Sequence, residues 1–357
     1  MIDVRVETTM DSAVRAQRLH LEVHLRASTG ITAIYGPHDS GKTLLFECIA
    51  GLHRPDRGRI LVRDRILFDA DSGVSLAVGT RQVGIVLERN CLLPHLTLRE
   101  NLAFAASRMP AREATQRVSE ILDRFSLGDV ADRVPRFLDP AEHRVGMIAQ
   151  ALIRRPDVLM VDAVPEEWEP SLRLQLFSLL REVATRDNVT ILLATRRLDD
   201  CFEAADSMVI LRDGKVAQDG TPSEVATKPA SVAVAEMLGT DLLIPAEIAF
   251  LDPQNKLSRL KVFGTEIPGP YFAGHFKGSK LMLCVAPSRV DCSPRNGNIA
   301  FPGHLPLVLR RAVVHAHDVR LYFEEGLVVD LPEVPPQSMQ AGSRWQMGIP
   351  PSAMRAL

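Results

Sequence analysis

The segment GPHDSGKT, residues 36–43, is the stretch that decides the fold. It follows the apolar run ITAIY (31–35) and opens TLLFECIAG (43–51), which has a helical composition. The pattern is GxxxxGK[ST], in which the glycines let the backbone curl until successive N–H groups face one anion. The dipole of the following helix adds positive potential at the same point. The segment therefore predicts a phosphate-binding loop between a strand and a helix.

Two residues of this loop have specific predicted roles. Lys42 should reach the β- and γ-phosphates of a nucleotide, and the Thr43 hydroxyl should be a ligand of Mg²⁺. Asp39 places a negative charge near the phosphates and would weaken their binding unless its side chain turns outward. A purely structural glycine turn is the alternative interpretation. The predicted ligands are ATP and Mg²⁺, and the predicted nucleotide-binding residues are Gly36, Pro37, His38, Asp39, Ser40, Gly41, Lys42 and Thr43.

A second apolar run, VLMVD (158–162), ends in a carboxylate. In nucleotide-binding domains of this kind, a second strand presents an aspartate to the Mg²⁺ side of the site. Asp162 is therefore the second predicted metal ligand, and an exposed aspartate in a turn is the alternative. The residue that follows it is Ala163, which cannot act on a water molecule.

The order of apolar segments predicts two domains. Strand-like and helix-like patterns alternate up to about residue 225, which indicates an α/β domain with a largely parallel sheet. After about residue 230, short β-branched segments are separated by Pro and Gly clusters, which indicates a small all-β domain. The boundaries are expected at 1–230 for the first domain, 231–243 for a connecting helix and 244–357 for the β domain. The predicted strands of the first domain are ITAIY (31–35), QVGIVL (82–87), VLMVD (158–162), VTILLA (189–194) and MVIL (208–211).

Composition sets limits on the partners of the chain. The 357 residues are 46% hydrophobic and 24% charged, with a net charge of -2 and scattered basic residues, so a nucleic-acid partner is not expected. The five cysteines form no CxxC pair, which argues against structural zinc. No apolar run approaches about 18 residues and the acidic N-terminus lacks the features of a signal peptide. A role at a membrane is therefore expected only through a partner.

The motifs and their order resemble the ATP-binding subunits of ATP-binding cassette (ABC) transporters, over nearly all of residues 1–225. The resemblance implies a P-loop NTPase fold with an antiparallel N-terminal part of the sheet and a helical subdomain at about 95–155. The segments GRILVRDRILFDADSGVSLAVGTRQVG (58–84) and LLPHLTLRENLAF (92–104) look most like the molybdate importer type. That type has a C-terminal regulatory β domain of the OB/TOBE-like kind, and CVAPSRV (284–290) is similar to a segment of it. The matching motifs are the Walker A loop, the Q-loop region (81–104), the signature helix, Walker B and D-loop (135–170), and the H-loop region (190–225).

The catalytic positions of the family are replaced in this chain. The family's Walker B strand ends in Asp-Glu, and loss of such a general base typically costs about 10²–10⁴-fold in rate; here the residue is Ala163. The H-loop histidine is Arg196, whose guanidinium can pair with a γ-phosphate but stays protonated. The Q-loop glutamine is Glu88, an additional candidate ligand of Mg²⁺ that lacks the amide donor. The resemblance thus implies that no catalytic residue is intact.

The signature motif departs furthest from the family. The family sequence Leu-Ser-Gly-Gly-Gln uses a hydroxyl and backbone N–H groups to cap the nucleotide of the partner subunit. Asp139 replaces the hydroxyl by a negative charge, and Pro140 removes one N–H group. Loss of one such donor commonly costs about 10²–10³-fold in rate. The degenerate signature consists of Leu138, Asp139, Pro140, Ala141 and Glu142.

Two other features concern a substitute base and the contact with adenine. Glu166 and Glu167 are candidate substitutes for the missing base, but they follow Pro165 and the backbone would have to fold back to bring them to the site. No aromatic residue precedes Tyr35, so contact with adenine is expected from Arg15 or from an apolar residue.

Two functions follow from the resemblance. The first is the ATP-binding subunit of an importer for molybdate or a related oxyanion, with weak or absent ATP hydrolysis. It would lie on the inner face of the cell membrane, bind a permease through the 90–104 segment and form a homodimer or a heterodimer. The alternative is a non-enzymatic ABC-like protein that senses nucleotide, or an oxyanion at its C-terminal domain.

Overall fold

The structure is a computed structural model that describes residues 1–11, 18–87, 91–295 and 303–357. The chain divides into two compact units, Met1–Thr227 and Lys228–Leu357. Two residues named above, Arg15 and Glu88, lie outside the described residues.

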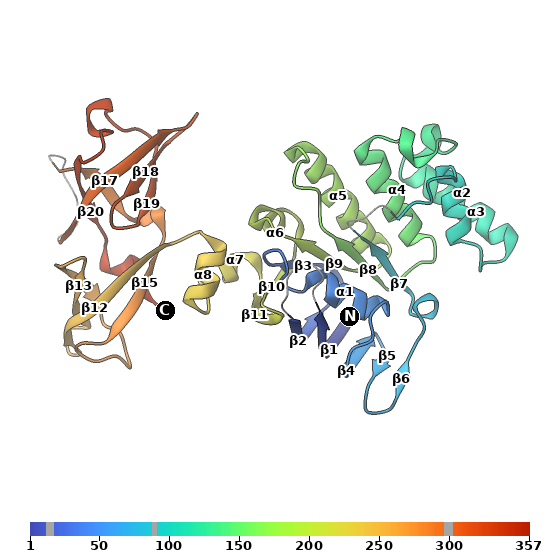
Figure 1. Ribbon diagram of the computed structural model, residues 1–357, viewed down its shortest axis with the longest axis horizontal. Helices are drawn as coiled ribbons and strands as arrows, with labels where there is room; N and C mark the ends of the chain where they lie inside the picture. Colours follow the sequence, from blue (N-terminus) through green and yellow to red (C-terminus); the bar gives the residue numbers. More distant parts are fainter. Residues whose placement is uncertain (12–17, 88–90, 296–302) are drawn as a thin grey trace. The chain divides into compact units, whose positions relative to one another are not determined.

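The first unit is built on an 11-stranded mixed sheet with the order β6-β5-β4-β1-β2-β11-β10-β3-β9-β8-β7. Strands β10, β3, β9, β8 and β7 are parallel, whereas β1, β2, β4, β5 and β6 form an antiparallel block (Figure 1). The α/β class and its antiparallel N-terminal part are therefore confirmed. The strands are β1 Ile2–Asp11, β2 Arg18–Ala27, β3 Gly30–Tyr35, β4 Arg57–Val62, β5 Arg65–Asp69, β6 Val74–Ser75, β7 Val83–Val86, β8 Val158–Asp162, β9 Thr190–Thr195, β10 Ser207–Arg212 and β11 Lys215–Gly220.

Helices accompany the parallel block, and their apolar faces explain their placement. Val118, Ile121 and Leu122 of α3 are buried in one core cluster with Ile148 and Leu152 of α4, as their helical spacing predicts. A group of helices, α2, α3 and α4, occupies residues 98–152, where the helical subdomain was expected. The helices of this unit are α1 Lys42–Ala50, α2 Leu98–Ala105, α3 Ala111–Arg124, α4 Pro140–Leu152, α5 Pro170–Arg186, α6 Leu198–Ala204 and α7 Pro222–Thr227.

Three neighbouring parallel strands bring the predicted site together. In the register of the sheet, Tyr35 of β3 pairs with Thr195 of β9, and Ala194 of β9 pairs with Asp162 of β8. All residues of β8 and β9 are buried, which explains their continuous hydrophobic runs. Because the carboxyl ends of parallel strands meet at one edge, the loops after β3, β8 and β9 share that edge.

The second unit begins with α8 Val232–Leu238 and continues as two antiparallel sheets. Both sheets contribute to one core, in which Trp345 is 1% exposed and its ring meets Phe323 edge-on at 6.0 Å between centroids. The predicted β domain is confirmed. One sheet has the order β14-β13-β12-β15-β21 and the other β16-β20-β17-β18-β19, with β12 Leu242–Asp252, β13 Leu257–Val262, β14 Thr265–Pro270, β15 Lys280–Val285, β16 Asp291–Pro294, β17 His304–Val314, β18 Val319–Phe323, β19 Val328–Leu331, β20 Arg344–Gly348 and β21 Arg355–Ala356.

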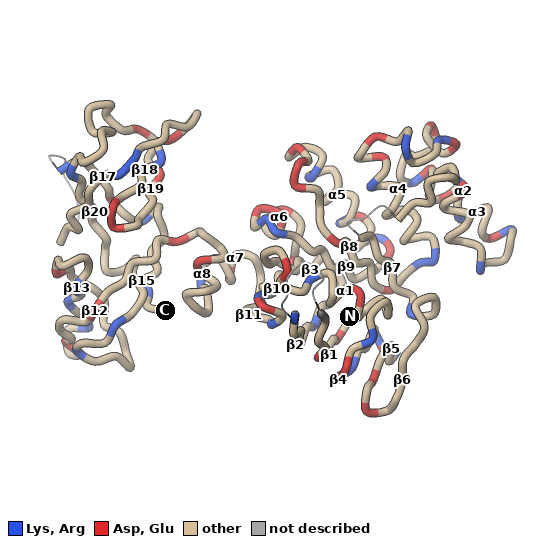
Figure 2. The backbone as a smooth tube through the Cα atoms, in the orientation of Figure 1, with Lys and Arg blue, Asp and Glu red and all other residues tan. Residues whose placement is uncertain are grey.

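The surface and the cysteines agree with the composition. Acidic and basic residues are interspersed along both units (Figure 2). Within the described ranges, every helix is too short or too polar to cross a lipid bilayer. All five cysteines are free, and burial raises the pKa of four of the thiols to about 12, which keeps them protonated: Cys48, Cys201, Cys284 and Cys292.

Candidate functional site

The phosphate loop, residues 36–43, connects β3 to α1. The N–H group of Gly36 donates to the carbonyl of Thr195 at 3.3 Å, so the loop begins in direct contact with the end of β9. A Cβ atom on Gly36 would lie 2.3 Å from the carbonyl oxygen of Leu211, which excludes any side chain there. Gly41 has a φ of 101° and is the N-cap of α1, a conformation that glycine adopts without strain. These contacts explain both glycines of the motif.

Lys42, Thr43 and Asp162 meet at the open end of the sheet. The Lys42 ammonium donates to the carbonyls of Gly36 and Pro37 at 2.7 and 2.6 Å, so it lies across the loop. The Thr43 hydroxyl donates to Asp162 Oδ2 at 2.9 Å, although the two residues are 119 positions apart. Asp162 is only 5% exposed. A hydroxyl and a carboxylate oxygen are the hard donors that Mg²⁺ prefers, so this pair fits that ion.

Asp39 is turned toward a neighbouring side chain. Its carboxylate lies 2.7 Å from Nδ1 of His38, and the His38 side chain is 73% exposed. Asp39 has a φ of 61°, in the left-handed region that aspartate tolerates better than most residues. The charge of Asp39 therefore has an adjacent partner within the loop.

A cavity of about 350 Å³ opens over the phosphate loop. It brings together the loop, Asp162, Ala163 and Arg196, three segments that are far apart in the sequence. Met10 and Leu19, which are opposite each other in the β1–β2 pair, supply apolar surface. These two residues were not singled out from the sequence, where only an unspecified apolar contact was expected. The lining residues are Met10, Leu19, His38, Asp39, Ser40, Gly41, Lys42, Thr43, Leu44, Glu47, Asp162, Ala163, Val164, Glu166, Ala194, Thr195, Arg196 and Arg197.

The backbone at Asp162 and Ala163 is fixed by a buried arginine. Arg144, on α4, is 5% exposed and donates to the carbonyl of Leu87 and of Asp162 at 3.1 Å each, and to the carbonyl of Ala163. Ala163 has a φ of 63°, an uncommon conformation for a residue with a side chain. The position after Asp162 is thus rigidly placed at the cavity, with a methyl group as its side chain.

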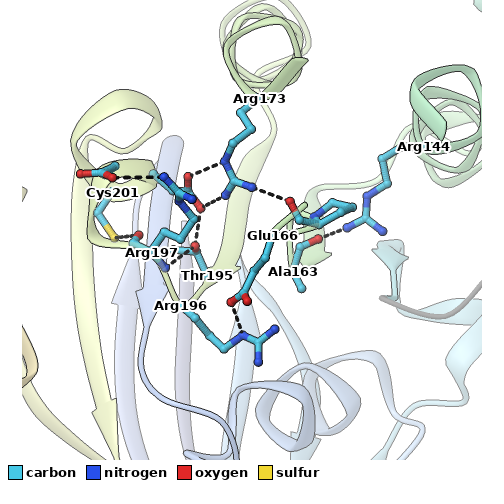
Figure 3. Close-up of polar contacts among 11 residues, drawn as sticks. Arg144, Ala163, Glu166, Arg173, Thr195, Arg196, Arg197 and Cys201 are labelled. Carbon is cyan, nitrogen blue, oxygen red and sulfur yellow. Dashed lines mark hydrogen bonds and ion pairs between the residues drawn. The ribbon is translucent and has the colours of Figure 1, made fainter. Parts of the chain in front are cut away.

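Glu166 lines the same cavity, although the sequence does not show that the backbone folds back to bring it there. The backbone turns after Pro165, whose carbonyl accepts from the N–H of Trp168 at 3.3 Å. The Glu166 carboxylate then lies 2.9 Å from Nε of Arg196 (Figure 3). A Pro followed by polar residues was the sequence signal for this turn, but it did not show where the carboxylate would point.

A buried ion pair holds the chain beside both members of the Glu166–Arg196 pair. Arg173, on α5, donates through Nε to Asp200 of α6 at 3.0 Å, and also donates to the carbonyl of Pro165 (Figure 3). Asp200 in turn accepts from the hydroxyl of Thr195. Arg173 and Asp200 are 4% and 2% exposed. The residues that precede Glu166 and Arg196 are therefore tied to one rigid network.

The degenerate signature segment, residues 138–142, forms a closed helix N-terminus. Asp139 is the N-cap of α4 and accepts from the N–H of Glu142 at 2.7 Å, while Glu142 accepts from the N–H of Asp139 at 2.9 Å. Pro140 is the first helical residue and has no N–H. This is a capping box, in which Asp139 and Glu142 satisfy backbone N–H groups of their own helix end. Among the described residues, this segment is not part of the cavity lining.

Comparison with known proteins assigns the family. A family model described as ABC transporter matches residues 20–164. The molybdenum import ATP-binding protein ModC of Paramagnetospirillum magneticum is 31% identical over 255 residues, which cover 71% of this chain and 70% of that protein. This chain belongs to the ABC transporter ATP-binding family. The ModC protein of Rhodospirillum rubrum is 33% identical over 66% of the chain, and the match spans 63% of that protein's length. The sulfate/thiosulfate import ATP-binding protein CysA of Synechococcus elongatus is 34% identical over 63% of the chain and 64% of its own length.

Solved structures show the same fold. A structure described as the ATP-binding subunit of an ABC transporter covers 67% of the chain and 99% of its own, with a TM-score of 0.54 and 25% identity. The dimeric ATP-binding cassette MJ0796 bound to ADP and Pi covers 62% of the chain and 99% of its own, with a TM-score of 0.53 and 22% identity. The predicted cassette fold is thereby confirmed.

Proposed function

We propose that the chain is the ATP-binding subunit of an ABC importer for molybdate or a related oxyanion, with weak or absent ATP hydrolysis. One observation carries the proposal: the phosphate loop and the Thr43–Asp162 pair are complete, while the next residue is Ala163. Binding of Mg-ATP needs the former, and activation of water needs the latter position. Met10 and Leu19 provide an apolar surface for the adenine ring, and Mg²⁺ would be held by Thr43 and Asp162.

The importer assignment rests on the relatives and on the 91–104 part of the predicted docking segment. Its loop is held by Asn101, which is fully buried and bonds the N–H and the carbonyl of Leu93 at 2.7 and 3.1 Å. Phe104, at the end of the segment, is 60% exposed. A rigid loop followed by an exposed aromatic residue is suited to binding a permease. The chain would thus work on the inner face of the membrane through that partner.

Dimerisation completes the proposal. MJ0796 is described as a dimer, and we extend this to the present chain, with itself or with a second ABC subunit. In a homodimer, each cavity would face the signature segment of the partner, where Asp139 and Glu142 already occupy each other's backbone donors. Such a signature adds negative charge and few free donors, which is a second reason for slow hydrolysis.

Steady-state ATPase measurements on the purified chain test the proposal. We expect turnover at least about 100-fold below the usual range of 1–10³ s⁻¹. Lys42→Ala is the control for contaminating activity. Ala163→Glu should raise turnover by on the order of tenfold, the incomplete gain expected while the signature is still capped. Turnover in the usual range that disappears in Lys42→Ala would show that hydrolysis is intact.

A non-enzymatic regulator is the second candidate, and the carboxylate of Asp139 and the missing N–H group of Pro140 at the start of α4 favour it. A helix end that carries a negative charge and lacks one N–H donor is poorly suited to contact the phosphates of a nucleotide. Calorimetry with Mg-ATP and, separately, with molybdate distinguishes the two candidates. The affinity for Mg-ATP is measured with and without a permease that co-purifies with the chain. An unchanged affinity favours the regulator, whereas a changed affinity favours the importer subunit. Absence of any binding at millimolar ATP would contradict the nucleotide-binding claim of both candidates, and binding of molybdate alone would leave only an oxyanion-sensing regulator.

A further inference from the structure

Glu166 and Arg196 form an ion pair inside the nucleotide cavity that no other feature of the site explains. The Nε–Oε1 distance is 2.9 Å, and the side chains of Arg196 and Glu166 are 36% and 54% exposed. Both line the same cavity as Lys42, which is expected to contact the β- and γ-phosphates of a nucleotide. An internal carboxylate is therefore paired with a cation at the place where phosphate oxygens are expected.

The main chain beside the pair is rigid, whereas the side chains of Glu166 and Arg196 are partly exposed to solvent. The buried Arg173–Asp200 pair bonds the carbonyl of Pro165 on one side and the hydroxyl of Thr195 on the other. The residues before Glu166 and Arg196 are thus fixed at the cavity. Because the two side chains are part exposed, each can change its rotamer without disturbing a packed core. The pair can separate by side-chain rotation alone.

A terminal phosphate carries about −1.5 to −2 charges at pH 7, more than a single carboxylate, so it attracts a guanidinium more strongly. Arg is always charged, and its fork of N–H groups can bind either group in a bidentate way. A part-exposed ion pair contributes little binding free energy, so it is readily replaced. ADP lacks the terminal phosphate and would leave the pair in place.

We infer that Glu166 competes with the terminal phosphate of ATP for the guanidinium of Arg196, and that this competition sets the preference of the cavity for ATP over ADP. The inference rests on the proposed ATP-binding function. It assigns Arg196 to the recognition of the terminal phosphate and Glu166 to an internal substitute for that phosphate.

Affinities of the full chain for a non-hydrolysable ATP analogue and for ADP, measured by calorimetry with Mg²⁺, test this. Arg196→Ala should weaken binding of the analogue by on the order of tenfold, with less than about a twofold change for ADP. Glu166→Gln should tighten binding of the analogue by about two- to fivefold, the gain expected when a weak internal competitor is removed. The two substitutions thus have opposite effects on one ligand.

The double variant separates competition from simple charge repulsion. In an Arg196→Ala background, Glu166→Gln should have no further effect, because no guanidinium is left to compete for. If Glu166 acted only by repelling phosphates, the tightening would persist in the double variant and the inference would be overturned. Glu167→Gln is the matched control, since it removes the same charge one residue away on an exposed side chain outside the cavity lining.

Other outcomes also decide the question. Glu166→Gln that leaves the affinity unchanged but abolishes residual turnover would assign Glu166 to the chemical step and overturn the inference. Equal loss of both ligands in Arg196→Ala would indicate a purely structural role for the arginine. Failure of the unmodified chain to bind either nucleotide would instead contradict the proposed function, so the two failures are distinguishable.

Discussion

Two helix N-termini of the first unit differ in how their backbone N–H groups are satisfied. Helix α1 begins after Gly41, and among the described residues no side chain caps it. Helix α4 begins at Asp139, and its first turn is closed by the reciprocal bonds of Asp139 and Glu142 and by Pro140. A helix end whose donors are not taken by its own side chains is suited to bind an anion, whereas a capped end is suited to stabilise the helix. The two helix ends are therefore suited to different roles.

The difference indicates which part of the family's chemistry is retained. The α1 end depends on backbone geometry, which Gly36 and Gly41 fix through close contacts and an unusual φ. In the proposed function, hydrolysis would depend on particular side chains, and a single replacement such as Ala163 would remove one of them without disturbing the fold. Binding and hydrolysis can therefore be lost separately in this architecture.

Gly36→Ala is expected to have the largest effect on ATP affinity, because it distorts the phosphate loop that leads into the N-terminus of α1. The new Cβ would meet the backbone oxygen of Leu211 at 2.3 Å, and neither backbone can yield without moving the loop. Affinity for ATP should fall by on the order of 100-fold, since charge-assisted hydrogen bonds are worth about 1.5–3 kcal/mol each. Calorimetry measures the change. Gly128→Ala is the matched control, with nothing within 4 Å of its Cβ, and an equal loss there would refute the explanation.

Restoring the hydroxyl and the N–H group of the family motif at the start of α4 should have a smaller effect. Asp139→Ser combined with Pro140→Gly, introduced into the Ala163→Glu variant, removes the carboxylate and restores one N–H group. Turnover should rise by about tenfold over Ala163→Glu alone, a conservative figure for a recovered donor. ATPase rates over a range of protein concentrations check this, because the effect requires a dimer. No change at any concentration would mean that α4 does not face a nucleotide.

Removing the cap without replacing it measures its structural role. Asp139→Ala should lower the free energy of unfolding by about 1 kcal/mol, the usual cost of losing an N-cap. Urea denaturation of the two proteins gives the difference. Asp123→Ala, on the exposed face of α3, should stay within about 0.5 kcal/mol of the unmodified chain. An unchanged free energy of unfolding in Asp139→Ala would show that the side chain of Asp139 does not stabilise the helix.

The smallest expected effect concerns His143, in the first turns of α4. Burial, and next the charge of Arg144, lower the pKa of His143 below its usual 6.5. The unfolded chain therefore binds a proton near pH 6.5 while the folded chain does so only at lower pH, so stability should fall as the pH drops below about 6.5. His143→Gln should reduce this slope. Urea midpoints at pH 7.5 and 5.5 test it, and identical slopes in both proteins would contradict it.

The sequence alone determined much about this protein. The GxxxxGK[ST] spacing, the alternation of strands and helices, and the change of texture near residue 230 depend on local patterns, and the structure confirms the fold class they predict. That Ala163 and Arg196 stand at replaced catalytic positions follows from the resemblance to the family and stays a prediction. The capping box of α4 is likewise local, because Asp139 and Glu142 have the spacing of that motif.

Only the tertiary structure decided the environment of the cavity. The Glu166–Arg196 pair joins residues 30 positions apart, and it depends on the turn after Pro165 and on the buried Arg173–Asp200 pair. Likewise, Met10 and Leu19 reach the site through the register of β1 and β2. Such contacts arise from long-range packing, in which the direction of one side chain is set by residues on other elements. Local sequence patterns do not encode that direction.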